Sequence, residues 1–440
     1  MRILFLAHRT PYPPNKGDKI RAFNLLSHLA KSHDVTLLYW VDDPEDLNHT
    51  PFLRSMCRGR VIPVRLNRTL AMGRGLRSLL RGESFTEGFY SAKSFQRELD
   101  NVLYGAPFDA VFAYSSAVAS YAKNIDARTK IVDFVDVDSV KWRQLGEVAS
   151  FPLSLLYSLE HSRLAKFEIS VSRWATRSLF VSHAEAELFK KTGGEGFIDF
   201  LSNGTDLELR RLPLEQIPYH LAAADRGSQA EGEKLIFVGT MDYPPNIDAV
   251  RHFAQDIFPL VRQKFPRSVF EVVGRRPPKS VRCLDQIEGV RVVGEVDDVR
   301  AYLVRADVSV APMRIARGVQ NKVLEAMAVG VPVVATPPAI EGIEVRDGEE
   351  VLIGAAAEEF ANQIIRVLSD AELRKAVTKK AWNKMNQCYN WELVGAKLDR
   401  LLTSAPIREP NPMTNVDVSI GHRCCIPVHF IPSLSGSAPQ

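Results

Sequence analysis

Short apolar segments alternate with helix-like segments along the first half of the chain. Two stretches, Lys19–Lys31 and Ser154–Arg177, have apolar residues at helical spacing. The apolar runs around them predict strands at Arg2–Ala7, Val35–Trp40, Val61–Leu66, Ala110–Tyr114, Lys130–Val135 and Ser178–Ser182. Continuous apolar strands separated by helices are typical of a parallel sheet that is covered on both faces.

The second half repeats this pattern. Strands are predicted at Leu235–Gly239, Val269–Gly274, Val290–Val293, Asp307–Ala311 and Pro332–Ala335. A helix capped by Asn246 is predicted to run to about Phe265. Because crossovers between parallel strands are right-handed, each half is expected to form a doubly wound sheet. The sequence therefore predicts an α/β fold of two facing Rossmann-like domains.

Composition shifts along the chain set the expected domain boundaries. The first domain is predicted at residues 1–205 and ends near the turn Asn203-Gly204-Thr205-Asp206. Residues 206–233 mix Pro, Gly, Ala and charge without a period, so they are predicted to be a linker. The second domain is expected at 234–403. Residues 404–440 are rich in Pro and Ser and are predicted to be a disordered tail.

Composition indicates an ordinary globular protein. The chain has 440 residues, 45% of them hydrophobic, and a formal net charge of +4. Its five cysteines are scattered and include no CxxC spacing, which argues against a disulfide framework or a structural zinc site and fits a reducing cytoplasm. The apolar start is too short for a signal peptide, and no stretch approaches the roughly 18 apolar residues of a spanning helix. A cytoplasmic location is expected.

The positive charge is concentrated in one segment. Between Pro51 and Gly82 there are eight arginines, no lysine and no acidic residue, so acids outnumber bases elsewhere. Leucines interleaved with Arg68, Arg74 and Arg77 resemble a basic amphipathic helix at a membrane surface. The segment Arg54–Arg81 is thus a candidate contact with an anionic membrane, on the inner face of the cytoplasmic membrane. A solvated helix that packs its leucines on its own domain remains the alternative, and no motif indicates nucleic acid.

The segment Ala311–Gly330 carries the clearest candidate chemistry. It reads as a strand, a glycine-containing loop and a short apolar helix that ends at Gly330. Lys322 lies in the first turn, where the helix dipole disfavours a cation unless an anion is bound. Glu325 lies among apolar residues and requires hydrogen-bond donors, which ribose hydroxyls or a structural Arg or Lys would supply. Together the two residues favour a nucleoside diphosphate site.

Several motifs resemble those of one family. The segment Lys322–Ala335 closely resembles the donor-site signature of the retaining nucleotide-sugar glycosyltransferases of family four. The turn Asn203-Gly204-Thr205-Asp206 is similar to that family's Asn-Gly-Val-Asp turn. Gly239–Asn246 is similar to a sub-branch found with bacterial exopolysaccharide genes, and His8–Arg21 resembles sugar transferases associated with PEP-CTERM exosortase systems. The resemblance covers roughly residues 1–403.

The resemblance implies a GT-B fold in which the second domain binds the nucleotide sugar and the first binds the acceptor. It implies hexosyl transfer with retention, without a metal or other cofactor. The expected catalytic residues are Glu325, Lys322 and Asp136. The expected donor-binding residues are Gly239, Thr240, Arg275, Arg317, Gly318 and Gln320, together with Lys322 and Glu325. Lys16, Gly17, Arg21 and Asp138 are the expected acceptor-binding residues.

This sequence departs from the family pattern at positions that contact the donor. Arg317 stands where many relatives have a Glu, and Thr240 and Pro245 stand where many have an Arg and a Lys. Lys322 is therefore the first candidate to meet the phosphate charge. Asp136 stands about where relatives often have a His, and Asp136-Val137-Asp138 also spells the DxD of metal-dependent GT-A transferases, a weak match.

The leading hypothesis is a glycosyltransferase of bacterial exopolysaccharide biosynthesis. It would move a sugar from a nucleotide donor to a polyprenyl-diphosphate-linked or other glycan acceptor. A non-hydrolysing nucleotide-sugar epimerase, which uses a similar two-domain scaffold, is an alternative. A non-catalytic polysaccharide-assembly scaffold is another, because Arg317 replaces the usual Glu.

Overall fold

The computed structural model describes residues 1–14, 16–205, 232–316 and 318–404 of the chain. Most of the predicted linker, at 206–231, and the predicted tail from 405 onward lie outside these described residues, as does Arg317. The described residues fall within one compact unit, Met1–Pro406. Among the described residues, no helix combines the length and the apolar character that crossing a bilayer requires.

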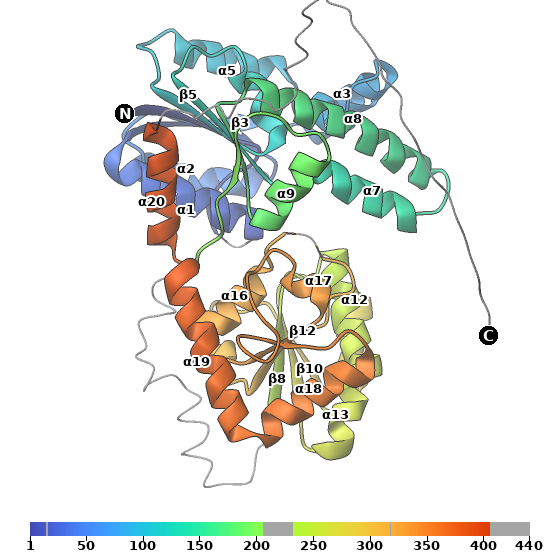
Figure 1. Cartoon of the computed structure of the whole chain (residues 1–440). Coiled ribbons are helices and arrows are strands. Elements are labelled where there is room, and N and C mark those ends of the chain that lie inside the picture. The colour runs from blue at the N-terminus through green and yellow to red at the C-terminus, as the bar shows by residue number, and fades with distance from the viewer. Residues whose placement is uncertain (15, 206–231, 317, 405–440) are drawn as a thin grey trace, which may run out of the picture. The chain divides into compact units, whose positions relative to one another are not determined.

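The first sheet has seven parallel strands in the order β3-β2-β1-β4-β5-β6-β7 (Figure 1). Their bounds are β1 Arg2–Ala7, β2 Asp34–Val41, β3 Val61–Arg65, β4 Ala110–Tyr114, β5 Thr129–Val135, β6 Arg177–Phe180 and β7 Ile198–Phe200. The strand order reverses between β1 and β4, which pair directly. This reversal is the switch point at which doubly wound sheets bind ligands, beyond the carboxyl ends of the strands.

The second sheet has six parallel strands in the order β10-β9-β8-β11-β12-β13. Their bounds are β8 Lys234–Val238, β9 Val269–Val273, β10 Val290–Gly294, β11 Val308–Ala311, β12 Val333–Ala335 and β13 Leu352–Ile353. Here the order reverses between β8 and β11. The two sheets confirm the predicted α/β class with doubly wound parallel sheets. Every predicted strand is present; β7 and β13, of three and two residues, were not predicted.

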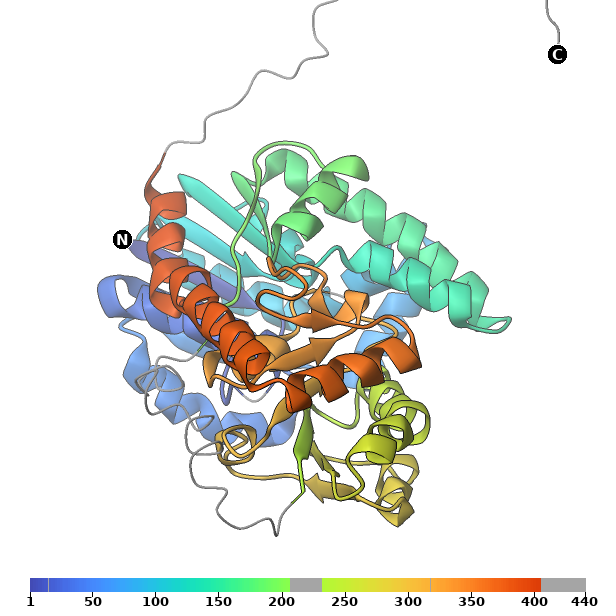
Figure 2. The ribbon, with the colours of Figure 1, turned by 60° about the horizontal axis from the view of Figure 1, so that its bottom comes forward.

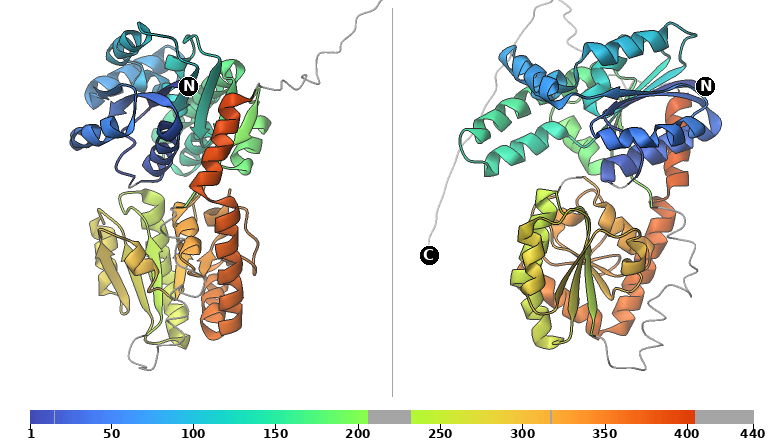
Figure 3. Two further views of the ribbon diagram at one scale, coloured as in Figure 1. Left: turned by 90° about the vertical axis from the view of Figure 1, so that its left-hand side faces the viewer. Right: turned by 180° about the vertical axis from the view of Figure 1, so that it is seen from behind.

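Helices connect the strands in both sheets (Figure 3). Those connected with the first sheet are α1 Gly17–Ser32, α2 Thr50–Met56, α3 Arg68–Leu80, α4 Phe85–Tyr90, α5 Lys93–Leu103, α6 Ala119–Ala122, α7 Asp138–Val148, α8 Leu153–Trp174 and α9 His183–Lys191. Those that follow β8 are α12 Pro244–His252, α13 Phe258–Lys264, α14 Lys279–Arg282, α15 Arg300–Leu303, α16 Asn321–Ala328, α17 Pro337–Ile340, α18 Ala357–Ser369, α19 Ala371–Cys388 and α20 Trp391–Thr403. A π-helical segment, Phe253–Ile257, joins α12 to α13.

The predicted cap of the helix after β8 is wrong. This helix, α12, begins at Pro244 after the N-cap Tyr243, and no side chain caps it. Proline fits the first turn because its φ is already helical and its missing N–H has no partner there. The side chain of Asn246 is instead turned toward the functional site described below.

The last described helix, α20, packs on the first sheet. Its buried side chains, Val394, Leu398, Leu401 and Leu402, share a core with Leu25 and Leu29 of α1 and with alternate residues of β1 and β2. Gly395 allows the close approach, since a Cβ there would overlap the ring of His28. The first strand, β1, and the last described helix, α20, thus belong to the same layer of the molecule (Figure 2).

Candidate functional site

A cavity of about 1170 Å³ lies at the carboxyl ends of the strands at both switch points. In the first sheet, residues after β1, β4 and β5 line it; in the second, residues after β8 and β9 and the start of α16 do. From the first sheet these include His8, Arg9, Lys16, Gly17, Asp18, Tyr114, Ser115, Asp136, Asp138 and Lys141. From the second they include Gly239, Thr240, Asn246, Arg275, Gln320, Asn321, Lys322 and Glu325.

The N-terminus of α16 opens on this cavity with a lysine held in a fixed position. No side chain caps the helix at Gln320. Lys322 Nζ donates to Oδ1 of Asn246 at 2.7 Å and lies 4.7 Å from the centre of the Phe237 ring. Asn246 Nδ2 donates in turn to the carbonyl oxygen of Thr240 at 2.9 Å. Asn246 therefore ties the lysine of α16 to the turn between β8 and α12.

Burial moves the ionisation of Lys322 and Glu325 toward neutral pH. It lowers the pKa of Lys322 to about 7, against the opposing influence of Glu325. It raises the pKa of Glu325 to about 7, against the influence of Lys322. Within the described part of the chain, no donor is hydrogen-bonded to the Glu325 carboxylate. A bound polyol could supply such donors, and a bound diphosphate would favour the charged form of Lys322.

Asp136 follows β5 at a strained turn. Val135 has φ +69°, which a β-branched residue rarely adopts outside functional sites. Oδ1 of Asp136 is buried and has no hydrogen-bond partner among the described residues. Burial and the nearby Glu185 raise the pKa of Asp136 to about 7. Gly318, with φ +62°, comes so close that a Cβ there would overlap the Asp136 carboxylate.

Two buried glutamates hold the segment that joins β5 to α7. The backbone N–H of Val137 donates to Glu185 at 2.8 Å, and that of Ser139 donates to Glu168 at 3.2 Å. Burial and the nearby Asp138 raise the pKa of Glu168 to about 8. These contacts fix Asp136 and Asp138 at the edge of the cavity.

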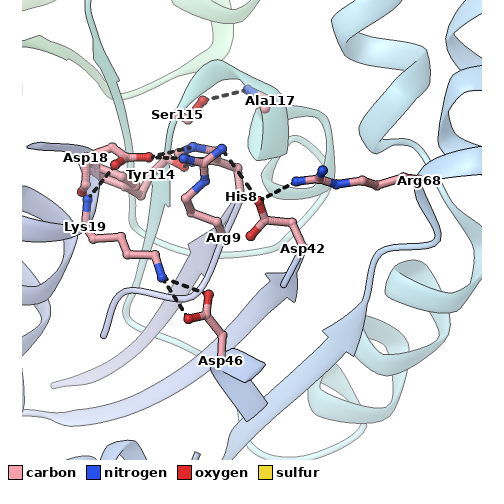
Figure 4. Close-up of polar contacts among 10 residues, drawn as sticks. All are labelled: His8, Arg9, Asp18, Lys19, Asp42, Asp46, Arg68, Tyr114, Ser115 and Ala117. Atoms are coloured by element: carbon pink, nitrogen blue, oxygen red, sulfur yellow. Dashed lines mark hydrogen bonds and ion pairs between the residues drawn. The ribbon is translucent and has the colours of Figure 1, made fainter. Parts of the chain in front are cut away.

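The loop after β1 contributes a polar network (Figure 4). The His8 ring stacks on Tyr114 at 5.7 Å, and burial, with a smaller effect from Arg9, lowers the pKa of His8 to about 4. Arg9 donates to Asp18 at 2.6 Å and lies 3.7 Å from Asp42. No role is predicted for His8, Arg9 and Asp18 from the sequence. Their position after a buried strand at a switch point was the available signal.

The predicted acceptor residues divide into two groups. Lys16, Gly17 and Asp138 line the cavity. Arg21 does not, because it is fully buried and binds Asp133 through two hydrogen bonds of 2.9 and 3.0 Å. Its third nitrogen donates to Leu201 O at 2.7 Å and to the side chain of Asn203. The guanidinium of Arg21 therefore links α1 to β5 and to the segment after β7.

The predicted donor residues gather at one wall of the cavity. Gly239, Thr240, Arg275 and Gln320 line it together with Lys322 and Glu325. Gly318 lies against Asp136, and Arg317 falls outside the described residues. The structure thus brings together the described donor candidates, although they come from three different loops of the second sheet.

Residues 232–370 match the protein family described as glycosyl transferases group 1. The similarity to that family lies in this stretch, which contains β8 to β13 and the helix α16 with Lys322 and Glu325. A phosphatidyl-myo-inositol mannosyltransferase of Propionibacterium freudenreichii subsp. shermanii is 28% identical over 209 residues, 46% of this chain and 50% of the relative. The chain therefore spans about half the length of that curated relative.

Solved structures with the GT-B fold are similar to this chain over most of its length. Sucrose-phosphate synthase of Thermosynechococcus elongatus aligns with a TM-score of 0.65 at 19% identity, covering 91% of this chain and 98% of its own. HepE of Anabaena, in complex with UDP and glucose, aligns with a TM-score of 0.63 at 15% identity, covering 91% and 99%. At these identities the likeness shows the fold, which extends on both sides of residues 232–370.

Proposed function

We propose that the protein is a retaining glycosyltransferase that transfers a hexosyl group from a nucleotide sugar to a lipid-linked or glycan acceptor. The observation that supports this most directly is the hydrogen bond from Lys322 to Asn246 at the N-terminus of α16. Glu325 lies on the same helix, and all three residues fall within the stretch that matches the group 1 family. The likeness to HepE, which was solved with UDP and glucose, agrees with a nucleotide-sugar donor. Exopolysaccharide assembly is the proposed pathway, on the basis of the sequence resemblance.

Lys322 is proposed to replace the cations that relatives carry after the first strand of this domain. Its amine reaches Asn246, which directly follows Pro245, one of the two positions where the sequence lacks that charge. With the uncapped N-terminus of α16, Lys322 would stabilise the diphosphate as it leaves. Glu325 would accept hydrogen bonds from the ribose hydroxyls.

The transfer step breaks the bond between the anomeric carbon and the diphosphate oxygen. A new bond forms on the same face of the sugar from the acceptor hydroxyl, whose proton passes to the leaving phosphate. Asp136 lies at the first-sheet side of the cavity with a raised pKa, so it is proposed to hydrogen-bond a sugar or acceptor hydroxyl. We propose that no metal or other cofactor takes part.

Lys16, Gly17 and Asp138 are the proposed acceptor contacts, since they line the opposite wall. The name of the curated relative specifies a lipid, phosphatidyl-myo-inositol, and this supports a lipid-linked acceptor. Such an acceptor and a nucleotide sugar would meet at the cytoplasmic face of the membrane. Nucleic acid is not a proposed partner.

Substitution of Lys322 and Glu325 tests the donor site. Lys322→Ala and Glu325→Ala should each lower turnover by about 100-fold, as the loss of a transition-state contact does. Each should also reduce the thermal shift produced by UDP, because a ligand that binds the folded state raises its stability. Lys279→Ala, an exposed lysine outside the cavity, is the matched control. Full activity in both folded site variants would refute the assignment.

One incubation separates this function from the alternatives. With a nucleotide sugar but no acceptor, a transferase leaves most of the donor unchanged. Conversion of the donor into its epimer would indicate an epimerase instead. Absence of any nucleotide-sugar binding in calorimetry would favour a non-catalytic scaffold.

A further inference from the structure

Helix α3 exposes its large apolar side chains and buries its small ones. Its buried residues are Ala71, Gly75 and Ser78. Leu70, Met72, Leu76 and Leu80 are 62%, 49%, 52% and 90% exposed. The packing of α3 requires this orientation, because a Cβ at Gly75 would overlap the ring of Phe85 in α4. Three of the four leucines of this helix, Leu70, Leu76 and Leu80, are therefore exposed rather than packed on their own domain, and Leu79 is half-buried.

A second apolar surface lies at the tip of the α7–α8 hairpin. The twelve residues from Val148 to Leu159 include no charged residue. Phe151 is 80% exposed, and Leu145, Leu153, Leu155, Leu156 and Leu159 are exposed as well. The two helices pack through Trp142 and Tyr157, whose rings lie 5.3 Å apart. The hairpin projects from the first sheet in Figures 1 and 3.

Buried polar contacts fasten α3 and α4 to α8. Glu160 of α8 accepts hydrogen bonds from the backbone N–H groups of Phe85 and Thr86 at the start of α4. Arg163 of α8 donates to the carbonyl oxygen of Leu79 in the last turn of α3. The exposed leucines of α3 and the exposed hairpin tip are therefore held on one structural element. We call these exposed apolar residues of α3, α7 and α8 the α3–α8 surface.

The charge along α3 is positive, whereas Arg143 and Glu147 lie as an ion pair beside the hairpin tip. Arg68, Arg77 and Arg81 are exposed at or next to α3, and no acidic residue occurs between Arg68 and Leu80. Anionic lipid attracts arginines, and the boundary between headgroups and acyl chains accepts large apolar side chains beside them. A lipid bilayer accommodates both the arginines and the exposed apolar side chains. It does not require the shape complementarity that a protein partner requires.

We propose that the α3–α8 surface docks on an anionic membrane, with Phe151 and the neighbouring leucines inserted at the headgroup boundary. The arginines of α3 then lie against lipid phosphates. This adds the α7–α8 tip, which is uncharged, to the basic segment that the sequence indicates. Burial of the exposed apolar side chains drives the insertion, and the arginines favour anionic over neutral lipid.

Docking would also place the catalytic cavity close to the bilayer. Helix α7 begins at Asp138, which lines the cavity, and ends at Val148 near the tip. At 1.5 Å per residue these two ends are about 15 Å apart. A lipid-linked acceptor in the bilayer would then present its headgroup within reach of Lys16 and Asp138. This last step rests on the proposed function, whereas the docking itself does not.

Vesicle sedimentation of the full chain tests the docking. Wild type should sediment with vesicles of phosphatidylcholine and phosphatidylglycerol and much less with phosphatidylcholine alone. Phe151→Ser with Leu155→Ser should weaken partitioning by roughly tenfold or more, and Leu76→Ser with Leu80→Ser should act in the same direction. Arg77→Ala with Arg81→Ala should lower binding chiefly at low salt. Tyr104→Ser, which replaces a 95% exposed aromatic residue outside this surface, should change nothing.

The proposal would be overturned if wild type stayed in the supernatant, or if wild type and both double-serine variants partitioned equally. It would also be overturned if wild type formed a dimer and the double-serine variants lost this dimer but not vesicle binding. The last outcome would make the surface an interface between copies. No donor is present in this assay, so its failure leaves the transferase proposal standing. Conversely, both serine pairs should keep wild-type turnover on a water-soluble acceptor and lose it on an acceptor embedded in vesicles.

Discussion

Lys322 and Glu325 lie on one turn of α16, and the same burial moves their pKa values toward each other. Burial lowers the pKa of Lys322 to about 7 and raises the pKa of Glu325 to about 7. The charged pair and the neutral pair are then close in energy near pH 7, and the two groups titrate as a coupled unit. A residue pair in this state responds strongly to a bound phosphate.

The pH dependence of kcat/KM should therefore be bell-shaped with its maximum near pH 7. Below the maximum, Glu325 gains a proton and accepts hydrogen bonds from the ribose more weakly. Above it, Lys322 loses the proton that binds phosphate. Lys322→Arg should remove the alkaline limb, and Glu325→Gln should remove the acid limb at a lower maximum. A wild-type profile in both variants would contradict these roles.

Asn246 is a positioning residue whose effect can be read in the same profile. Asn246→Asp places a carboxylate at the oxygen that lies 2.7 Å from Lys322 Nζ. The added charge raises the pKa of Lys322, so the alkaline limb should move to higher pH. Asn246→Ala should lower kcat/KM by about tenfold, because the amine loses its fixed position. A purely structural asparagine would change stability in these variants without moving the limb.

Arg21 is expected to act on stability rather than on the acceptor. Arg21→Met leaves Asp133 buried without its partner, which typically costs about 3–5 kcal/mol of unfolding free energy. Urea denaturation measures this loss. Arg21→Met with Asp133→Asn should recover part of it, since the unpaired charge is gone. A stable Arg21→Met variant with a raised acceptor KM would return Arg21 to the role that the sequence suggested.

Individual site residues could be predicted where their chemistry conflicts with their local surroundings. Lys322 conflicts with the helix dipole and Glu325 with its apolar neighbours, and both line the cavity. The partner of Arg21 could not be predicted, because Asp133 is 112 residues away and only the sheet brings the two together. His8 and Arg9 were missed for a similar reason: their contacts come from β4 and from the loop after β2.

Helix α8 carries a buried carboxyl group, that of Glu168, whose ionisation is unfavourable. Burial raises the pKa of Glu168 to about 8, so the folded state retains a proton that the unfolded state has already released. The stability that this proton provides is fully present below the unfolded pKa of about 4.3 and is lost as pH rises through 8. Protonated Glu168 thus favours folding at mildly acidic pH.

Glu168→Gln should flatten this dependence. The amide mimics the protonated acid, so the free energy of unfolding should fall less between pH 5 and pH 8 than in wild type. The difference at pH 8 should be on the order of 1–3 kcal/mol. Ser139 N–H still has an acceptor in the variant. Parallel slopes for wild type and Glu168→Gln in urea denaturation at both pH values would contradict the assignment.

Most strands were predictable because their side chains are apolar and buried, and this holds even for β12 with three residues. Strand β7 also has three residues, but they are only half-buried and include Asp199, and β13 has only two residues, so neither gives such a pattern. Helix α3 shows the opposite limit. Its amphipathic pattern is clear in the sequence, but periodicity cannot tell which face is buried. Gly75 and Ser78, not the leucines, face α4.

Over the whole molecule, the path of the chain matters as much as its local pattern. Helix α20 follows the second sheet in the sequence, yet its buried side chains belong to the core of the first sheet. His28 of α1 also lies 2.9 Å from Asp399 of α20. The amphipathic pattern of α20 predicts a buried face but does not indicate which sheet it covers. Only the tertiary structure assigns this helix.

A truncation at one buried leucine of α20 should therefore weaken the first sheet. Leu398 is fully buried beside α1, so Leu398→Ala should lower the free energy of unfolding by about 2–5 kcal/mol. Leu393→Ala, at a 47% exposed site on the same helix, should change it by less than about 0.5 kcal/mol. Hydrogen exchange locates the effect: amides of β1, β2 and α1 should lose protection in Leu398→Ala, and those of β8 and β11 much less. Equal loss in both sheets would show that α20 stabilises the compact unit as a whole rather than the first sheet.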